Sequence, residues 1–453
     1  MKKIFAIILV FLISGCISQT GKLEKVSIPI EERKMVEVYF CPEDECGDKL
    51  AEFLSSANES IHCAFYDLNL KNVIHSLKRN LDVKIVVDFK NKGKLTELNP
   101  VYNYGDQLMH NKFCVIDNKI VLTGSFNPTE NDNFLNNNNL VVLESKFLSE
   151  NYEEEFQELF GKKFSGGEKV KYPVIFLGET EIENYFCPED GCSEKIAEEI
   201  GNSKFSVYFM TFSFTDDKIG NILLRLKEDG IDIKGVLEKG QENNYSEYNR
   251  LKNGGIDVKL DSNKYNMHHK VFIIDNLTVI TGSYNPTKSG DERNDENILI
   301  IKDEKIAKKF LKEFEYVWEY DGLIKDYCTE AEDLLISQVY YDAIGKDKDE
   351  EFLEIYNPTK KEINLEYYFI SNGKDLQRLN GFIKSGEKRK IYPDVSLLNS
   401  NGYIILSKGI RQKDFVSWEG LWKLKADKGE VLKRKSFEMA NCEEEWEKYK
   451  LLE

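Results

Sequence analysis

The sequence lacks several features that would each indicate a class of protein. It has no excess of positive charge, since its formal net charge is −17 and its pI is about 5.1. Such an acidic chain is a poor general binder of nucleic acid, because nonspecific binding needs cationic surface facing phosphates, although a local basic cleft is compatible with it. Histidine is scarce, with five among 453 residues. After residue 13, no apolar run approaches the length that spans a membrane. The 41% of hydrophobic residues suffices for buried cores in roughly two to four domains.

The N-terminus reads as a targeting segment. Two lysines precede the apolar run Ile4–Ile13, which is followed by Ser14-Gly15-Cys16. Small residues leading into a cysteine resemble the lipobox of prokaryotic lipoproteins, with Ile13 where leucine is commoner. This resemblance implies a lipoprotein signal and tether over residues 1–19, with Cys16 lipidated and the protein anchored to the membrane at the cell surface or in the periplasm. A plain cleaved signal peptide is the alternative.

Eight cysteines remain after Cys16, in a compartment that favours disulfides. Two pairs lie at equivalent places in FCPEDEC and FCPEDGC, with no histidine or further cysteine beside them, which argues against zinc. Cys63 and Cys114 lie in apolar strand-like runs whose counterparts are Phe209 and Phe272, so we expect buried thiols there. The disulfide candidates are Cys41, Cys46, Cys187, Cys192, Cys328 and Cys442.

One longer pattern occurs twice. Residues 109–127 read MHNKFCVIDNKIVLTGSFN, and residues 267–285 read MHHKVFIIDNLTVITGSYN. Two equivalent half-sites predict one composite active site between two repeats. The shared positions are His110, Lys112, Asp117, Gly124, Ser125 and Asn127, then His268, Lys270, Asp275, Gly282, Ser283 and Asn285.

Each copy sits in a region where strand and helix patterns alternate, which predicts an α/β fold with two pseudo-symmetric halves. Expected strands in the first half are 61–65, 83–87, 113–116 and 120–123, with helices near 49–53 and 73–77. The second half follows the same order, after a linker at Lys163–Thr180, and carries extra residues around Gly240–Asn253 that we expect to form a polar loop. After about Lys325, short β-rich runs separated by turns predict an all-β sandwich.

The repeated residues suit a phosphodiester. His and Lys two apart on a strand share a face. A neutral imidazole can attack phosphorus, while a protonated one can deliver a proton to the leaving oxygen. Lysine, asparagine and serine side chains can hold the non-bridging oxygens as charge builds. Asp117 and Asp275 face away from the lysines and are expected to orient the framework. Nothing resembles a dedicated metal site, so we expect catalysis without metal or another cofactor.

The pattern His-x-Lys-x4-Asp-x6-Gly-Ser-x-Asn, present twice, resembles the HKD motif of the phospholipase D superfamily. The likeness covers about residues 36–325 and implies two α-β-α repeats with mixed sheets, whose motifs meet at a pseudo-twofold interface. It also implies that one histidine forms a phosphohistidine while the other protonates the leaving group and then activates water. Carried over, His110 is the nucleophile and His268 the acid/base. The motif lysines and asparagines bind phosphate, helped by Ser125 and Ser283.

The family often has a glutamate shortly after the motif, and Glu296 matches it. The first copy has Asn138 there instead, so the half-sites are not equivalent, and the reverse assignment of the two histidines stays open. The C-terminal region resembles a lamin-tail domain, an immunoglobulin-like sandwich, in the stretches Ile336–Asp342 and Glu351–Pro358. We therefore expect four parts: the tether at 1–19, repeats at 36–165 and 177–326, and the lamin-tail-like domain at 328–445.

The motif does not select the substrate. The compact repeats and the lamin-tail resemblance favour a surface-tethered endonuclease or broad phosphodiesterase, and the tether would equally place a phospholipase D beside membrane phospholipids. Cationic residues with stacking aromatic side chains near the site would favour single-stranded nucleic acid, and an apolar tunnel would favour lipid. A surface binding protein with a retired site is the third hypothesis, which intact motifs in both copies oppose. Both motifs lie in one chain, which predicts a monomer; the partner of the lamin-tail domain is unknown.

Overall fold

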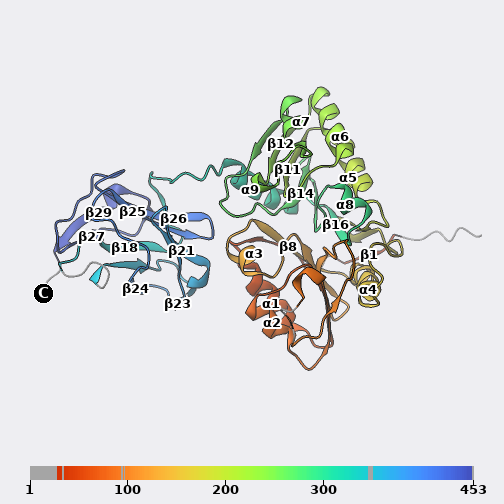
Figure 1. The fold of residues 1–453 in the computed structure, drawn as a ribbon, viewed down its shortest axis with the longest axis horizontal. Coiled ribbons are helices and arrows are strands. Elements are labelled where there is room, and N and C mark those ends of the chain that lie inside the picture. Colours follow the sequence, from red (N-terminus) through yellow and green to blue (C-terminus); the bar gives the residue numbers. More distant parts are fainter. Residues whose placement is uncertain (1–27, 33–34, 93–94, 96, 345–349, 451–453) are drawn as a thin grey trace, which may run out of the picture.

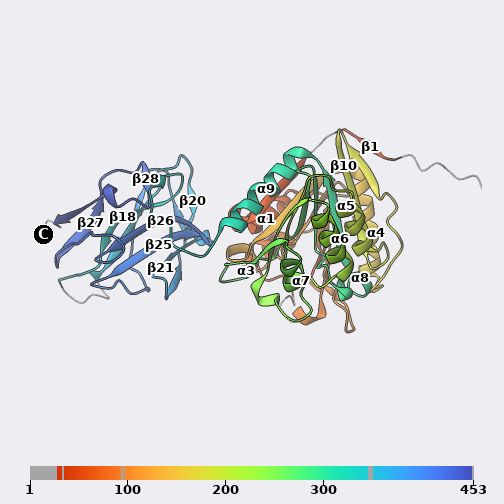
Figure 2. The same cartoon turned by 90° about the horizontal axis from the view of Figure 1, so that it is seen from above.

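The computed structural model describes residues 28–32, 35–92, 95, 97–344 and 350–450. The tether expected at residues 1–19, including Cys16, lies outside this range. Among the described residues, no helix is both long enough and apolar enough to cross a membrane. Figure 1 shows two α/β repeats facing each other and an all-β domain to one side, where α3 (Glu130–Phe134) and α9 (Glu304–Glu319) lie. Figure 2 shows the same arrangement from above.

The first repeat has a seven-stranded mixed sheet in the order β2-β8-β7-β6-β3-β4-β5. Its neighbours β3/β4 and β4/β5 are parallel, and the remaining pairs are antiparallel. All four predicted strands and both predicted helices are confirmed. The elements are β2 (Val36–Cys41), α1 (Cys46–Ser56), β3 (Ser60–Phe65), α2 (Lys71–Leu77), β4 (Asp82–Val87), β5 (Val101–Tyr102), β6 (Lys112–Ile116), β7 (Ile120–Gly124), β8 (Asn138–Glu144) and α4 (Lys146–Phe160).

The second repeat has a nine-stranded sheet in the order β1-β9-β10-β16-β15-β14-β11-β12-β13. Its edge strand β1 (Ile30–Glu31) comes from the N-terminal segment and pairs with β9 (Val174–Leu177). The expected linker at Lys163–Thr180 is therefore partly wrong, because β9 belongs to the second sheet. The other elements are β10 (Thr180–Cys187), α5 (Cys192–Gly201), β11 (Ser206–Thr211), α6 (Asp217–Glu228), β12 (Asp232–Leu237), β13 (Asp257–Leu260), β14 (Lys270–Ile274), β15 (Thr278–Gly282), α8 (Lys288–Glu292) and β16 (Glu296–Lys302).

The polar segment around Gly240–Asn253 is not wholly a loop. Its second half forms α7 (Glu247–Asn253), which buries Leu251 and the Glu247 side chain. Ser246 caps the helix, since its hydroxyl accepts a hydrogen bond from the Tyr248 amide. The high polarity of the segment concealed a short helix that needs only one apolar residue facing the core.

The two repeats share one hydrophobic core. Residues of α4 and α9 pack with the facing strands of both sheets, including Tyr152, Phe156, Phe310, Leu143 and Ile301. Each is at most 1% exposed. Because the core belongs to both halves, neither repeat buries its inner face alone, and the relative position of the two motifs is fixed by packing.

The six candidate cysteines form three disulfides, and a fourth disulfide corrects an expectation. Cys41–Cys46 and Cys187–Cys192 tie the end of a strand to the next helix in each repeat, and Cys328–Cys442 staples the C-terminal domain. The expectation of free buried thiols at Cys63 and Cys114 is wrong, because they form a disulfide. The two residues are direct partners across the antiparallel pair β3/β6, with Cα atoms 4.1 Å apart. In the second repeat, Phe209 and Phe272 occupy the same register.

The C-terminal region is all-β apart from short 3-10 turns. It contains a five-stranded sheet, β24-β19-β18-β27-β29, and a four-stranded sheet, β22-β21-β25-β26. The short β-rich runs of the sequence, at 335–340, 352–356, 367–370 and 403–406, lie in strands β18, β19, β21 and β25, except that residue 367 ends a 3-10 turn. The strands of the two sheets are β18 (Leu335–Tyr340), β19 (Phe352–Tyr356), β21 (Tyr368–Ser371), β22 (Leu376–Arg378), β24 (Lys388–Ile391), β25 (Gly402–Lys408), β26 (Arg411–Trp418), β27 (Glu430–Arg434) and β29 (Trp446–Lys450).

This domain is docked on the repeats. Tyr367 accepts a hydrogen bond from Asn133 Nδ2 of α3 at 3.2 Å. Arg411 of β26 reaches Glu313 of α9, with Nη2 2.5 Å from Oε2. Glu313 is 3% exposed, so this ion pair is largely removed from water on its acidic side.

Candidate active site

Each motif is a β-hairpin in the centre of its sheet: β6/β7 in the first repeat and β14/β15 in the second. The turn residues Asp117 and Asn118 have positive φ values of 51° and 50°, which Asp and Asn tolerate better than most residues. Gly124 ends the first hairpin, where a Cβ would lie 2.4 Å from the Asn139 carbonyl oxygen. The repeated glycine is therefore required by the close approach of the neighbouring strand.

The backbones of the two motifs are hydrogen-bonded to the opposite repeats. The His110 amide donates to the Asp295 carbonyl at 2.9 Å, and the His268 amide donates to the Asn137 carbonyl at 2.9 Å. Isolated bridges therefore form beside each histidine, between Met109 and Asp295 and between Asn137 and Met267. The structure brings both histidines to one interface, as two composite half-sites would require.

Each imidazole is held by a side chain from the other repeat. Nδ1 of His110 lies 2.8 Å from Oε2 of Glu296, at the start of β16. Nδ1 of His268 lies 2.9 Å from Oδ1 of Asn138, at the start of β8. Ser283 also donates to Glu296, at 2.7 Å. Both rings are oriented through Nδ1, which leaves Nε2 for reaction.

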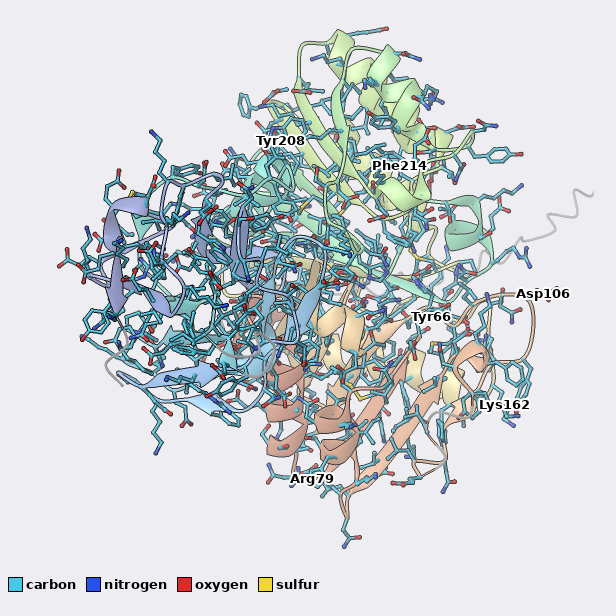
Figure 3. The ribbon with its side chains drawn as sticks, turned by 60° about the vertical axis from the view of Figure 1, so that its left-hand side comes forward. Tyr66, Arg79, Asp106, Lys162, Tyr208 and Phe214 are labelled. Carbon is cyan, nitrogen blue, oxygen red and sulfur yellow. A yellow bond between two sulfur atoms is a disulfide. The ribbon has the colours of Figure 1, made fainter. Side chains whose placement is uncertain are left out.

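The two lysines are buried beside the histidines. Nζ of Lys112 donates to the His110 carbonyl at 2.7 Å, and Nζ of Lys270 donates to the His268 carbonyl at 2.8 Å. Aromatic rings cap the two pairs: Tyr66 lies 4.9 Å from His110 between ring centroids, and Phe212 lies 4.7 Å from His268. Figure 3 shows Tyr66 where the two repeats meet.

Burial dominates the electrostatics of these four groups. It lowers the pKa of His110 and lowers that of His268 further, with additional effects of nearby lysines in both cases. Burial also lowers the pKa of Lys112 to about 8. The pKa of Lys270 is lowered well below its ordinary value by burial and then by the charge of Lys112. An anionic group placed between the lysines would relieve this repulsion, so the site is built to receive a negative charge.

The motif asparagines and serines occupy the same region. Asn127 donates its amide hydrogens to Asp132, from N at 2.9 Å and from Nδ2 at 2.8 Å. Among the described residues, Oδ1 of Asn127 and Oδ1 of Asn285 are buried without a hydrogen-bond partner. Ser125 accepts a hydrogen bond from the Asn139 amide, so it helps to hold the start of β8.

Asp117 and Asp275 are not brought to the histidines. Asp117 lies in the β6/β7 turn and accepts hydrogen bonds from the amides of Asn58, Glu59 and Ser60. Asp275 accepts equivalent bonds from the amides of residues 204–206. Each carboxylate therefore ties its hairpin to the chain entering the neighbouring strand.

A polar network at the interface was not anticipated from the sequence. Asn297 donates to Asn111 at 2.7 Å and accepts from Thr123 at 2.9 Å. The mirrored position Asn139 contacts His269 at 3.1 Å, and its Oδ1 accepts from Thr281. Alignment of the two repeats would have paired these residues, because each is polar in both copies.

Asp132 is a second residue that sequence reasoning missed. It is 4% exposed, and its Oδ2 lies 3.5 Å from Nδ1 of His268. Its counterpart in the second repeat is Gly290, so comparison of the repeats gave no reason to single it out. The sequence signal that could have identified Asp132 is the presence of a charged residue in one copy of the repeat and its absence from the other.

Two groups of described side chains gather at least three donor atoms of the kind that bind metals. One contains Cys328 and Cys442, whose sulfurs form a disulfide. The other consists of Glu155, Glu158 and Glu189. Neither group includes a motif histidine.

Comparisons with known proteins show the following similarities. Residues 50–160 and 196–318 match the family described as "Cardiolipin synthase, PLD-like domain". The chain is 32% identical over 142 residues to "Phospholipase D" of Rickettsia conorii, covering 31% of this chain and 71% of that protein. It is 33% identical over 118 residues to "Mitochondrial cardiolipin hydrolase" of Homo sapiens, covering 26% of this chain and 47% of that protein. Among solved structures, it is similar to the phospholipase D family member Nuc from Salmonella typhimurium, with 32% identity, coverage of 31% and 95%, and a TM-score of 0.30.

Proposed function

This chain belongs to the phospholipase D superfamily of phosphodiester hydrolases, and we propose that it cleaves nucleic acid through a phosphohistidine on His110. The observation that carries the catalytic part is the cross-repeat arrangement of two histidines, each held through Nδ1 by the other repeat. One site therefore contains two imidazoles with free Nε2 atoms and two buried lysines. This is the set that a two-step displacement at phosphorus needs.

The unequal partners of the two rings support the assignment of roles. Glu296 accepts the Nδ1 hydrogen of His110, so Nε2 of the neutral ring carries the lone pair that attacks phosphorus. A carboxylate also stabilises the positive ring that exists while phosphorus is bonded to Nε2. Asn138 is neutral, and the carboxylate of Asp132 lies 3.5 Å from Nδ1 of His268, farther than the 2.8 Å between Glu296 and Nδ1 of His110. The imidazolium of His268 is therefore stabilised less, which suits a group that must give up its proton.

In the first step the bond from His110 Nε2 to phosphorus forms, the bond to the leaving oxygen breaks, and His268 protonates that oxygen. In the second step His268 takes a proton from water, the water oxygen attacks phosphorus, and the phosphorus–nitrogen bond breaks. Lys112 and Lys270 hold the non-bridging oxygens throughout. The proton balance closes, because His268 returns to its protonated form and His110 to its neutral form.

Side chains on a loop beside His110 support nucleic acid as the substrate. Asp88, which precedes this loop, accepts a hydrogen bond from the Met109 amide at 2.9 Å. Phe89, which begins a 3-10 turn, is 43% exposed, and Tyr104, which follows β5, is 61% exposed; their ring centroids lie 5.4 Å apart. Lys92 lies over the Phe89 ring, 5.0 Å from its centroid. Exposed rings beside a cation are the combination that stacks on bases and attracts phosphates.

Hydrolysis of a membrane phospholipid is the second candidate. It is supported by similarity to proteins named phospholipase D and mitochondrial cardiolipin hydrolase. The same two-histidine chemistry would release a headgroup alcohol instead of a nucleotide end. The chemistry of the reacting group is therefore common to both candidates, and they differ in what the flanking loops bind.

We further propose that the protein is a monomer anchored through a lipidated Cys16 at the cell surface or in the periplasm. In this proposal the C-terminal β-domain is an immunoglobulin-like lamin-tail domain that positions the substrate. The support is the sequence resemblance and the presence of both motifs in one chain. Lipidation is tested by mass spectrometry of the membrane fraction, with Cys16→Ser as the control.

The decisive experiment is an activity panel in EDTA on single- and double-stranded DNA, RNA, phosphatidylcholine vesicles and bis-p-nitrophenyl phosphate. We expect nucleic-acid cleavage that is lost in His110→Ala and in His268→Ala. Headgroup release from vesicles alone would instead establish the phospholipid candidate. Activity that survives both substitutions would refute the two-histidine mechanism, and a wild-type protein inactive on every substrate would leave a binding protein.

The loop is tested in the same panel with Phe89→Ala and Tyr104→Ala. Loss of both stacking contacts should raise KM for single-stranded DNA by about thirtyfold or more, at about 1–3 kcal/mol per ring. The turnover of bis-p-nitrophenyl phosphate, which offers no base to stack, should change little. Phe205→Ala, which removes an aromatic side chain that is 76% exposed before β11, is the matched control.

A further inference from the structure

Among the aligned positions at which the two half-sites differ, two concern the place of a carboxylate. Aligning the motif histidines pairs Asn138 with Glu296 and Asp132 with Gly290. The second repeat thus has a carboxylate at the start of its strand and no side chain in its short helix. The first repeat has an amide at the start of its strand and a carboxylate in its short helix. Each half-site keeps one carboxylate, at a different position.

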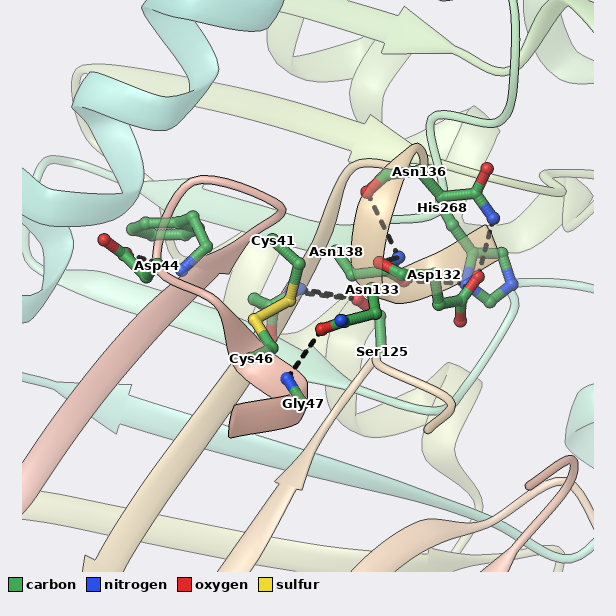
Figure 4. Close-up of a disulfide and its surroundings, with 12 residues drawn as sticks. Cys41, Asp44, Cys46, Gly47, Ser125, Asp132, Asn133, Asn136, Asn138 and His268 are labelled. Atoms are coloured by element: carbon green, nitrogen blue, oxygen red, sulfur yellow. Dashed lines mark hydrogen bonds and ion pairs between the residues drawn. A yellow bond between two sulfur atoms is a disulfide. The ribbon is translucent and has the colours of Figure 1, made fainter. Parts of the chain in front are cut away.

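The structure assigns to Asp132 the role of the charged partner of His268, replacing the glutamate that this half-site lacks; the assignment rests on the proposed function. Asn138 holds the Nδ1 hydrogen of His268 at 2.9 Å, and Asp132 Oδ2 lies 3.5 Å from the same nitrogen. The amide sets the orientation of the ring, and the carboxylate supplies the negative charge that an amide cannot. Figure 4 shows Asp132, Asn136, Asn138 and His268 gathered at this point.

Burial raises the pKa of the Asp132 carboxyl group, and its hydrogen-bond partners counter that effect by favouring the ionised form. These partners are the N and Nδ2 of Asn127, at 2.9 and 2.8 Å, and the Nδ2 of Asn136, at 2.6 Å. All of these groups donate, and none accepts. A protonated carboxyl group would need an acceptor for its own hydrogen, whereas a carboxylate accepts from every one of them.

Asp132 is not a residue that the fold itself requires. At Gly290 an added Cβ would lie 2.5 Å from the Asn285 carbonyl oxygen, so the second repeat forms the same short helix with no space for a side chain. Thr129 and Thr287 cap the two helices in the same way. The first repeat has a buried carboxylate in its short helix, and the His268 imidazole is a titratable group that this carboxylate contacts.

The carboxylates of Asp132 and Glu296 both interact electrostatically with Lys112 and Lys270. Burial lowers the pKa values of Lys112 and Lys270, and the charges of Asp132 and Glu296 both counter that effect. One carboxylate from each repeat therefore balances the pair of lysines, so the site keeps its two-fold distribution of charge although its sequence is asymmetric. The titratable or charged groups facing His268 are Lys270, Lys112, His110, His269 and Asp132, and Glu238 binds the preceding Met267 amide.

A positioning residue for the general acid has a signature that a merely structural residue does not. Protonation of the leaving oxygen matters greatly for a poor leaving group and little for p-nitrophenolate. We expect Asp132→Asn to lower kcat about tenfold or more on single-stranded DNA or phosphatidylcholine, whichever is cleaved, and less than about threefold on bis-p-nitrophenyl phosphate. Loss of the carboxylate also lowers the pKa of His268, so the alkaline limb of kcat should move to lower pH by about one unit.

The negative charge can also be moved from position 132 to position 138, where the second repeat has its carboxylate. Asp132→Gly should be as slow as Asp132→Asn, and Asp132→Gly combined with Asn138→Glu should recover most of the activity by copying the second repeat. Glu130→Gln is the matched control, because it removes a carboxylate from the same helix that contacts Arg378 rather than a histidine. It should leave both the rate and the pH profile unchanged.

Asn138→Ala leaves Asp132 unchanged, so it provides a second measurement if the Asp132 variants fail to fold. Its alkaline limb should stay at the wild-type pH even if kcat falls. Equal losses on both classes of substrate in Asp132→Asn, with an unmoved alkaline limb, would overturn the assignment. So would an alkaline limb that moves in Asn138→Ala alone. A wild-type protein inactive on every phosphodiester would instead refute the proposed function itself.

Discussion

Glu296 of the second repeat holds the imidazole of His110 in the first repeat, with Oε2 2.8 Å from Nδ1. Neither residue has this partner within its own repeat, so the pair exists only when the two repeats are packed together. The shared core beneath them makes that packing obligatory. The proposed activity therefore requires association of the two repeats.

Glu296→Gln should lower kcat by on the order of 10²–10⁴-fold, because an amide can present its NH2 to Nδ1 and select the wrong tautomer of His110. Glu296→Asp, which keeps the charge, should lose less. The measurement is the pre-steady-state burst of p-nitrophenolate with substrate in excess, which reports formation of the phosphoenzyme. An unchanged burst rate in Glu296→Gln would show that Glu296 does not act through His110.

Substrate affinity should depend on the charge of Lys112. Burial lowers the pKa of this lysine to about 8, so above that pH the free enzyme progressively loses a cation from its phosphate site. KM for an anionic diester should then rise with pH, by up to about tenfold per unit. KM measured from pH 6 to pH 10 checks this, with Lys112→Met as a control that should have a high KM and no such dependence.

Much of the fold followed from the sequence because the repeat doubles each signal. The strands before and within the two motifs, the paired cysteines and the site histidines were all predicted. The features that could not be predicted are those formed by residues that one repeat has and the other lacks. Cys63 and Cys114 were compared with two phenylalanines, and only the register of β3 against β6 reveals that they are opposite each other. Asp132 was missed for the same reason, because it aligns with Gly290 in the second repeat.

Loss of the Cys63–Cys114 disulfide should lower the free energy of unfolding by about 2–4 kcal/mol, since the bridge closes a loop between residues 51 apart in sequence. The check is chemical denaturation of Cys63→Ala/Cys114→Ala against the wild type, without reductant. A double variant as stable as the wild type would show that the bridge does not form in the protein. Activity per folded molecule should be unchanged, because both residues lie outside the site.

Asp117 should be important for stability and dispensable for chemistry. Burial raises the pKa of its carboxyl group, but the backbone amides of residues 58–60 outweigh burial and the net shift is downward. Because the folded pKa is lowered, this contribution to stability is present above the unfolded pKa and is lost as pH falls through the folded one. Asp117→Asn should cost about 1–3 kcal/mol at pH 7 and less at low pH, as measured by thermal unfolding, with kcat near wild type. A kcat as low as that of His110→Ala would place Asp117 in the chemistry instead.

Arg411 connects the C-terminal domain to the interface behind the site. Its guanidinium binds Glu313, whose Oε1 lies 3.4 Å from Nε2 of His269, the residue next to His268. Arg411→Ala would leave a buried carboxylate without its cation, and we expect a loss of about 3–5 kcal/mol in the free energy of unfolding. Adding Glu313→Gln should restore much of this, because the uncompensated charge is then gone. Arg378→Ala is the control, because its pair with Glu130 is more exposed and should cost less than about 1 kcal/mol. Equal losses in the single and double variants would mean that Arg411 acts through packing on Tyr316, 3.6 Å from that ring's centroid, rather than through charge.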